Sequence, residues 1–274
     1  MLKKIFLALI CAVLFPAVPM IADEAEGPVP NEKPATPGEQ VLCSMTISYS
    51  HPLAFDTDAQ FKTDFELPYW VYLPLCDSEK TGDGYPLIIF LHGSEERGLN
   101  EAALKAGLPR RIKKEKETWP FITVTPVCPL KRRWIEMDLR PLVEKLIADY
   151  EVDPDRVYIT GLSMGGFGTW DALLKDPDLY AAAAPIAGGC EAEWAPKLLD
   201  IPIWAAHGEE DPCVRVAWSI DISRAIEEQG GKKIKLSLFP DAEHDVWTPI
   251  YRDPEFYKWL LSHRLSDRKP KEEK

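Results

Sequence analysis

Residues 157–166 read VYITGLSMGG, a short apolar run that passes directly into a glycine-rich turn around a serine. The run Val157–Thr160 is typical of a strand buried on both faces, and the residues from there to Leu174 have helical spacing. A serine with a glycine two residues before it and another two residues after it, placed where a strand turns sharply into a helix, can project its hydroxyl. We interpret Ser163 as a nucleophile and the backbone N–H of Met164 as a donor to the negative charge that its attack creates. The alternative is an ordinary turn in which the serine caps the helix.

The rest of the chain alternates between short apolar runs and amphipathic stretches. The apolar runs predict strands at Phe65–Leu73, Leu87–Leu91, Phe121–Val124, Ala181–Ile186, Ile203–Ala206 and Ile234–Phe239. The amphipathic stretches predict further helices at Leu139–Tyr150, Trp218–Gln229 and Pro254–His263. Such alternation predicts an α/β fold with a mostly parallel central sheet flanked by helices, and with its functional site beyond the carboxyl ends of the strands.

A serine nucleophile needs a base, and the five histidines differ in how well they fit that role. His244 lies in the polar loop 240–245, directly after the last predicted strand, where its side chain can turn toward Ser163. The alternative is a histidine of a surface loop without a role. The other four precede the core, belong to the last helix, or stand before a glycine where they shape loops: His51, His263, His92 and His207.

A carboxylate that orients the histidine is expected between the nucleophile and the base in the chain. The acidic loop HGEEDP at 207–212 follows a predicted strand, and Asp211 is the preferred candidate because Pro212 restricts its backbone. Glu209 and Glu210 are the alternatives. The resulting order of serine, aspartate and histidine differs from that of the common serine proteases.

Two further features concern the cleft around this serine. A second backbone donor is expected in the loop after the strand Leu87–Leu91, and the N–H of Ser94 is the candidate. The connection between the strands that end near Ala187 and begin at Ile203 is short, which predicts an open cleft without a cap domain. The aromatic residues near the strand ends are candidates for substrate binding, with packing as the alternative for each: Trp134 and Trp247.

Five segments of the chain resemble bacterial dienelactone-hydrolase and prolyl-oligopeptidase-like serine esterases of the α/β-hydrolase superfamily. In chain order these segments read PLIIFLHGSEERG, VTPVCPLKRRW, VDPDRVYITGLSMGGFGTW, IWAAHGEEDPCV and FPDAEHDVW. The resemblance extends from about Pro68 to Leu265 and implies the nucleophile, acid and base named above, with the oxyanion loop at residues 93–94. Similar proteins often read HGAGERG where this chain reads HGSEERG, so Glu95 replaces a glycine and puts the conformation of that loop in doubt.

These residues predict a serine carboxylesterase that hydrolyses short-acyl or aryl esters, including esters carried on polysaccharides, without a metal or an organic cofactor. A peptidase of the prolyl-oligopeptidase kind is one alternative, although the chain has no room for the large extra domain of those enzymes. A hydrolase fold that binds without catalysis is the other. The partners of the predicted esterase are small or polymer-borne esters, and the oligomeric state is left open.

The chain begins with features of a secretory signal. Lys3 and Lys4 precede the apolar run Ile5–Val18, and Ala22 is a plausible last residue before cleavage. The run is short for a membrane span of about 20 residues, so we expect removal and export to the periplasm or the medium rather than stable insertion. The predicted organisation is a signal peptide, a proline-rich linker, a single catalytic domain and a disordered tail, at residues 1–22, 23–40, 41–265 and 266–274.

Charge and cysteine content restrict the partners. The net charge is −12, and it becomes −14 without the signal because that segment holds two lysines and no acidic residue. Such a charge argues against nucleic acid or an anionic membrane as the main partner. Five cysteines remain outside the signal, an odd number to which we assign no disulfide, and their spacing indicates no metal site: Cys43, Cys76, Cys128, Cys190 and Cys213.

Overall fold

The computed structural model describes residues 36–53, 56–98 and 101–268, so the predicted signal peptide and most of the predicted linker lie outside the described residues. These residues form an eight-stranded sheet with the order β1-β2-β4-β3-β5-β6-β7-β8. The strands are β1 (Gln40–Leu53), β2 (Asp56–Tyr72), β3 (Tyr85–Leu91), β4 (Ile122–Pro126), β5 (Val152–Leu162), β6 (Ala182–Ile186), β7 (Ile203–Gly208) and β8 (Ile234–Phe239). Strands β3 to β8 are parallel, whereas β2 is antiparallel to β1 and to β4. The predicted mostly parallel α/β fold is confirmed.

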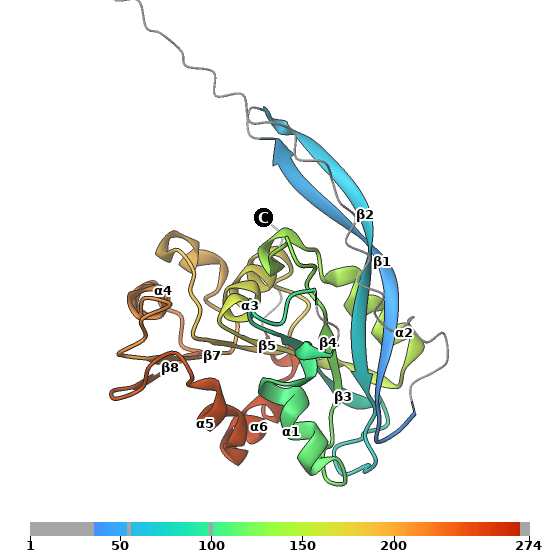
Figure 1. The fold of residues 1–274 in the computed structure, drawn as a ribbon. Helices are drawn as coiled ribbons and strands as arrows, with labels where there is room; N and C mark the ends of the chain where they lie inside the picture. The colour runs from blue at the N-terminus through green and yellow to red at the C-terminus, as the bar shows by residue number, and fades with distance from the viewer. Residues whose placement is uncertain (1–35, 54–55, 99–100, 269–274) are drawn as a thin grey trace, which may run out of the picture.

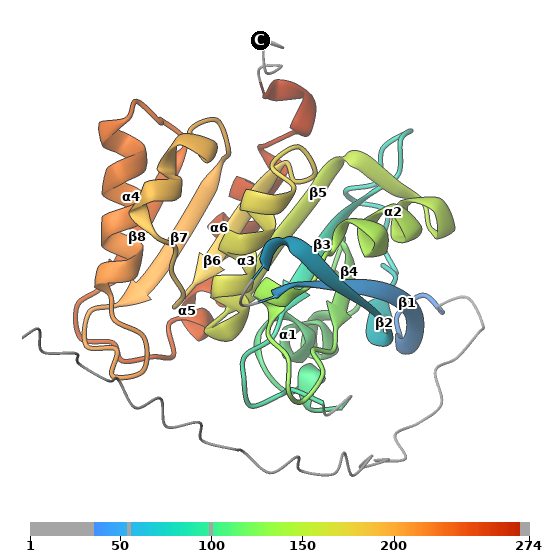
Figure 2. The same cartoon turned by 90° about the horizontal axis from the view of Figure 1, so that it is seen from above.

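Helices cover both faces of this sheet (Figure 1). They are α1 (Gly107–Glu115), α2 (Arg140–Asp149), α3 (Met164–Lys175), α4 (Ala217–Glu228), α5 (Trp247–Arg252) and α6 (Pro254–Leu261). Helices α2, α3 and α4 lie on one face, as Figure 2 shows from above, and α1, α5 and α6 lie on the other. The connection between β6 and β7 is short, as predicted, and holds a single 3-10 helix, Ala192–Lys197.

Two hydrophobic cores separate the sheet from its two layers of helices. In β3 the side chains of Leu87, Ile89 and Leu91 join one core, while Ile88 and Phe90 join the other. All five are fully buried, as expected of a central parallel strand whose successive side chains point to opposite faces. This burial explains why an unbroken apolar run, rather than an alternating pattern, marked the strand in the sequence.

The antiparallel edge of the sheet differs from the prediction. The predicted strand Phe65–Leu73 covers only the end of β2, which begins at Asp56 and pairs along its length with the unpredicted β1. Both strands contain many polar residues, because a hairpin at a sheet edge does not need two apolar faces. In Figure 1 this blue hairpin rises well beyond the layer of helices.

The end of the predicted linker and the start of the predicted tail both make ordered contacts. Pro37 forms a bridge with Leu73, and the N–H of Gly38 donates to the Leu73 carbonyl at 2.9 Å, so the last linker residues join the sheet. At the other end, the N–H of Ser266 donates to Asp155 Oδ1 at 2.6 Å, and Arg268 donates to the Tyr180 carbonyl at 2.9 Å. The prediction of a disordered tail from residue 266 is therefore wrong for residues 266–268. Their polar composition indicated a solvated segment, because the acceptors of their hydrogen bonds are distant in the sequence and come close only when the chain folds.

Within the described ranges we find no helix of the length and hydrophobicity that a membrane crossing requires.

Candidate active site

Ser163 lies in a strained turn between β5 and α3. Its φ of 54° is positive, a conformation that costs free energy in a residue other than glycine, and its N–H is held by the Ile186 carbonyl at 2.9 Å. The flanking glycines allow the turn to close. A Cβ at Gly165 would lie 1.9 Å from the Leu91 carbonyl oxygen, and one at Gly161 would lie 2.4 Å from the Gly165 oxygen. The pattern around the serine is thus explained by packing of backbone on backbone.

The structure brings the three predicted catalytic side chains together in one hydrogen-bonded line. His244 Nε2 lies 2.9 Å from Ser163 Oγ, and His244 Nδ1 lies 2.6 Å from Asp211 Oδ2. An ionised carboxylate can only accept, so Nδ1 carries the proton and the lone pair of Nε2 faces the serine hydroxyl. The three residues follow β5, β7 and β8, which end at the same edge of the parallel sheet. The rival acids Glu209 and Glu210 are exposed.

The side chain of Asp211 is buried, and both of its oxygens accept hydrogen bonds. Its Oδ1 accepts from the N–H groups of Cys213 at 2.8 Å and Val214 at 2.9 Å. Burial raises the pKa of Asp211, but the hydrogen bonds from Val214, His244 and Cys213 outweigh it and leave the pKa below its ordinary value. The group therefore stays ionised at neutral pH, as the orientation of His244 requires.

Two buried histidines shape loops, as expected. His92 Nε2 accepts from the Cys128 N–H at 3.0 Å, so its Nδ1 carries the proton and donates to the Gly93 carbonyl at 2.7 Å. His207 Nε2 lies 2.9 Å from the Val214 carbonyl and 3.2 Å from Asp211 Oδ2. Burial lowers the pKa of His92 to about 4 and also lowers the pKa of His207, so both are neutral.

The two predicted oxyanion donors line one cleft with Ser163. This cleft has a volume of about 350 Å³, and its lining includes Ser94 and Met164. As the first residue of α3, Met164 has a backbone N–H that the helix leaves without a partner. The loop that carries Ser94 lies close by, because a Cβ at Gly93 would be 3.8 Å from Ser163 Cβ. The proximity agrees with the assignment, although the role of each N–H stays a prediction.

The two tryptophans singled out in the sequence have different surroundings. Trp134 also lines the serine cleft, but its ring is buried over Gly168 and its Nε1–H donates to the His92 carbonyl at 2.9 Å. Trp247 is half-buried and meets the His244 imidazole edge to face, with 5.2 Å between ring centroids. Both rings therefore have a packing role, and contact with substrate stays a prediction.

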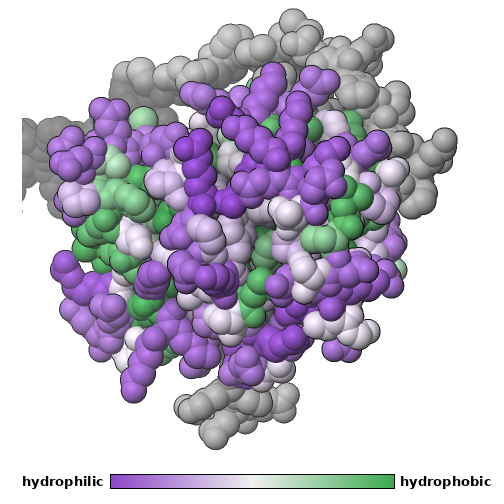
Figure 3. Space-filling view, turned by 90° about the horizontal axis from the view of Figure 1, so that it is seen from below, coloured by the Kyte–Doolittle hydropathy of each residue, from purple (hydrophilic) through white to green (hydrophobic). Residues whose placement is uncertain are grey.

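A second cleft includes Trp247 in its lining and is rich in basic residues. Besides this tryptophan, its lining includes basic residues of α1, of the preceding segment and of α5: Lys105, Arg110, Arg111, Lys114 and Arg252. Arg111 is paired with Glu115 at 2.8 Å, whereas the other four form no ion pair within the described part of the chain. Figure 3 views the molecule from the side of α1, α5 and α6, where hydrophilic residues predominate. The lining also includes the acidic residues Glu115 and Asp245, which the basic residues outnumber, so net positive charge gathers near the candidate base of an acidic protein.

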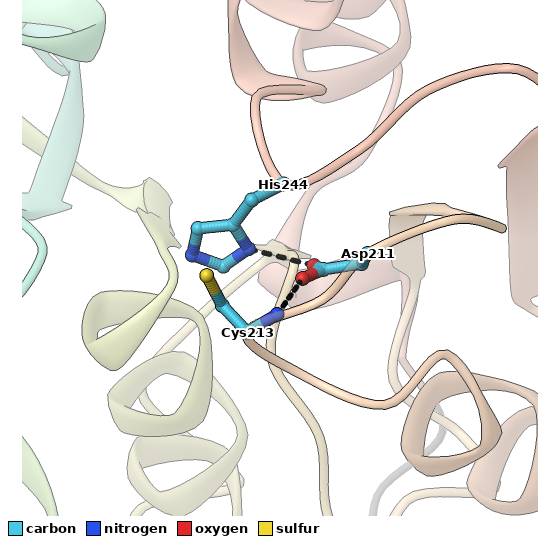
Figure 4. Close-up of side chains that lie close together, drawn as sticks. All are labelled: Asp211, Cys213 and His244. Carbon is cyan, nitrogen blue, oxygen red and sulfur yellow. Dashed lines mark hydrogen bonds and ion pairs between the residues drawn. The ribbon is translucent and has the colours of Figure 1, made fainter.

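One residue near Ser163 and His244 was not predicted from the sequence to lie at the site. The thiol of Cys213 is exposed and directed toward the imidazole of His244, as Figure 4 shows. Its proximity depends on the neighbouring loops after β7 and β8, and no spacing in the sequence could reveal it. All five cysteines outside the predicted signal are free.

Comparison with known proteins finds a family model and several hydrolases to which this chain is similar. The model of the dienelactone hydrolase family matches residues 124–249, which contain Ser163, Asp211 and His244. A protein of Nocardia uniformis subsp. tsuyamanensis named as the esterase NocK is 32% identical over 145 residues, 47% of this chain and 41% of its own length. The bifunctional acetylxylan esterase/xylanase XynS20E of Neocallimastix patriciarum is 31% identical over 70 residues, 26% of this chain and 10% of its own.

The crystal structure of a thermostable esterase superposes with a TM-score of 0.60 at 28% identity, covering 80% of this chain and 63% of that one. The chain thus spans less than two thirds of each of these relatives. The described chain therefore has the α/β-hydrolase fold, and its residues 124–249 match the dienelactone hydrolase family.

Proposed function

We propose that this protein is an exported serine carboxylesterase that forms an acyl-enzyme on Ser163. The observation that carries the proposal is the continuous hydrogen-bonded line from Ser163 Oγ through His244 to Asp211 Oδ2, with 2.9 Å and 2.6 Å between successive atoms. A neutral serine hydroxyl is a weak nucleophile, and an imidazole of fixed tautomer supplies the base that it lacks.

The proposed reaction has two halves. In the first, Ser163 Oγ attacks the ester carbonyl carbon while its proton passes to His244 Nε2. The carbonyl oxygen becomes negative and accepts from the N–H groups of Met164 and Ser94. The intermediate then collapses, the ester C–O bond breaks, and His244 returns the proton to the leaving alcohol. In the second half, water attacks the acyl-enzyme by the same route and releases the acid.

The shape of the cleft favours acyl groups that are short or aromatic and leaving groups that are large. The cleft beside Ser163 is open and partly apolar, with Phe167 and the exposed Ile135 in its lining. An open cleft without a cap leaves space for the polymer that carries the ester. A relative with a similar segment is named as an acetylxylan esterase, in keeping with polysaccharide-linked esters as substrates.

Export is proposed from the first 22 residues, which have the charge and hydrophobic pattern of a signal peptide. Expression of the full chain in a bacterium with an intact secretory pathway tests this. We expect a processed protein outside the cytoplasm whose mass lacks the first 22 residues or a closely similar segment. Retention of the full-length chain in the cytoplasm would contradict export.

A substrate panel tests the activity. Protein lacking residues 1–22 is assayed with p-nitrophenyl acetate, butyrate, ferulate and palmitate, and with peptide p-nitroanilides. We expect hydrolysis of the acetate, butyrate and ferulate, little action on the palmitate or the peptides, and a loss of about 10³-fold or more in Ser163→Ala. Hydrolysis of peptides alone would favour a peptidase, and no hydrolysis of any ester would favour a binding protein.

A further inference from the structure

The exposed thiol of Cys213 forms a cluster with two of the candidate catalytic residues. One ligand atom from each of Asp211, Cys213 and His244 lies within 4.8 Å of the other two. The N–H of Cys213 donates to Asp211 Oδ1 at 2.8 Å and fixes the backbone of the loop after β7. Figure 4 shows that the side chain of Cys213 then extends from this loop toward the imidazole.

The imidazole in this cluster is arranged as a metal ligand. Histidines that bind zinc usually donate one ring N–H to a carboxylate and bind the metal through the other nitrogen. His244 already has this arrangement, because Nδ1–H donates to Asp211 Oδ2 at 2.6 Å and Nε2 keeps a lone pair. A thiolate and an imidazole are the ligands that zinc prefers.

In the cluster Cys213 Sγ lies within 4.8 Å of a ring nitrogen of His244, so the side chain of Cys213 has to move for both residues to bind one ion. Zinc lies about 2.3 Å from sulfur and about 2.0 Å from nitrogen, so a tetrahedral ion requires the two ligand atoms to lie about 3.5 Å apart. Cys213 is exposed, so rotation of its side chain can shorten the separation. The other free thiols do not compete on equal terms, because Cys43, Cys128 and Cys190 are buried and Cys76 is only half-exposed.

We propose that Cys213 Sγ and His244 Nε2 bind a thiophilic divalent cation such as Zn²⁺, and that the ion reversibly inhibits ester hydrolysis. The inhibition rests on the proposed function, because the ion occupies the lone pair that takes the proton of Ser163. Water or the serine hydroxyl completes the coordination. Binding converts the Cys213 thiol to a thiolate and releases its proton, whereas the neutral imidazole loses none. The affinity therefore rises with pH.

Binding is measured first, without any need for activity. Isothermal titration with ZnCl₂ is carried out on three proteins that all carry Ser163→Ala. The first has no other substitution, the second also carries Cys213→Ser, and the third carries Cys76→Ser as the matched control. We expect one ion per chain and release of about one proton in Ser163→Ala and its Cys76→Ser derivative, and an affinity at least about tenfold lower with Cys213→Ser. Equal affinity in all three proteins would overturn the site.

Inhibition is measured second, on proteins with an intact serine. Hydrolysis of p-nitrophenyl acetate is followed with ZnCl₂ or MgCl₂, each rate relative to that of the same protein in EDTA. We expect Zn²⁺ but not Mg²⁺ to inhibit the unmodified protein and Cys76→Ser, EDTA to restore the rate, and Cys213→Ser to require about tenfold more Zn²⁺. Tight binding without inhibition would overturn the assignment of His244 Nε2. If no metal-free protein hydrolyses an ester, the proposed function fails, and the binding experiment still decides the site.

Discussion

Asp211 shows how closely a single side chain can be fixed by its neighbours. Its two oxygens face different groups: Oδ1 accepts from the backbone N–H groups of Cys213 and Val214, and Oδ2 accepts from His244. Backbone N–H groups can only donate, so the side chain at this position must keep an acceptor toward them. The second terminal atom of this side chain, which faces His244, then determines which nitrogen of His244 carries the proton.

This geometry predicts the effect of Asp211→Asn. The amide oxygen stays with the two backbone donors and the NH₂ group faces His244 Nδ1, which must then accept. The proton moves to Nε2, which can no longer deprotonate Ser163. We expect kcat for p-nitrophenyl acetate to fall by about 10³- to 10⁴-fold, as in other serine hydrolases with this change. Asp245→Asn is the control, because Asp245 interacts only with Thr248 among the described residues, and it should stay close to the unmodified rate. Similar rates for both variants would refute the role of Asp211.

The buried His92 predicts how stability depends on pH. Its pKa is lowered to about 4 because burial disfavours the charged ring, and the unfolded chain binds the proton with a pKa near 6.5. The contribution of His92 to the free energy of unfolding is therefore at its full value above about pH 6.5. It falls by up to about 3 kcal/mol as the pH falls toward 4, because the unfolded chain binds the proton first. Urea unfolding at several pH values should show this loss in the unmodified protein and a smaller one in His92→Gln. An identical pH dependence would contradict it.

The candidate triad could be predicted residue by residue because each member stands at the end of a recognisable strand. Cys213 and the contact of His207 with Asp211 could not, because they depend on how two loops meet in space. The same limit applies to His92, whose position before a glycine indicated a loop but not its two hydrogen bonds.

The packing of α3 against β3 depends on the absence of a side chain at Gly165. A Cβ there would lie 1.9 Å from the Leu91 carbonyl oxygen, so helix and strand would have to separate. We expect Gly165→Ala to lower the free energy of unfolding by about 1–3 kcal/mol or more. Gly82→Ala is the matched control, because nothing lies within 4 Å of a Cβ at Gly82, and we expect a change within about 0.5 kcal/mol. Equal stability of the two variants in urea would contradict this packing.

Helix α1 supplies part of the basic cleft beside Trp247, and we expect this charge to favour anionic esters. Replacing both Arg110 and Lys114 by glutamine should raise KM for a carboxylate-bearing aryl ester about fivefold at low ionic strength, and much less at high salt. KM for p-nitrophenyl acetate should hardly change. Lys113→Gln is the control, since Lys113 is exposed on the same helix but does not line the cleft. Equal effects on the neutral and the anionic ester would count against the prediction.

The elements that could be predicted are those buried on both faces or strongly amphipathic. Strands β3 to β8 and helices α2, α3, α4 and α6 agree with the predicted segments to within a few residues. Of the hairpin β1–β2 only the end of β2 was predicted, because polar residues break the apolar runs in the rest of it. Helix α1 was missed because its few buried residues, Leu108, Pro109 and Ile112, stand among many charged ones.

The molecule as a whole combines a net charge of −12 with positive charge beside its candidate active site. Global charge thus says little about the local field that a substrate meets. The topology has the larger consequence for function. Because β5, β7 and β8 are parallel in one sheet, three residues distant in the chain arrive at one edge.

The most direct test of this arrangement is covalent labelling of the nucleophile. The protein is treated with a fluorophosphonate probe, digested and analysed by mass spectrometry, in parallel with Ser163→Ala and with His244→Ala. We predict that the adduct lies on Ser163, that it is absent from Ser163→Ala, and that it forms at least about 10²-fold more slowly in His244→Ala because the hydroxyl has lost its base. Labelling that persists in Ser163→Ala, or that proceeds at the same rate without His244, would contradict the assignment of Ser163 as a nucleophile activated by His244.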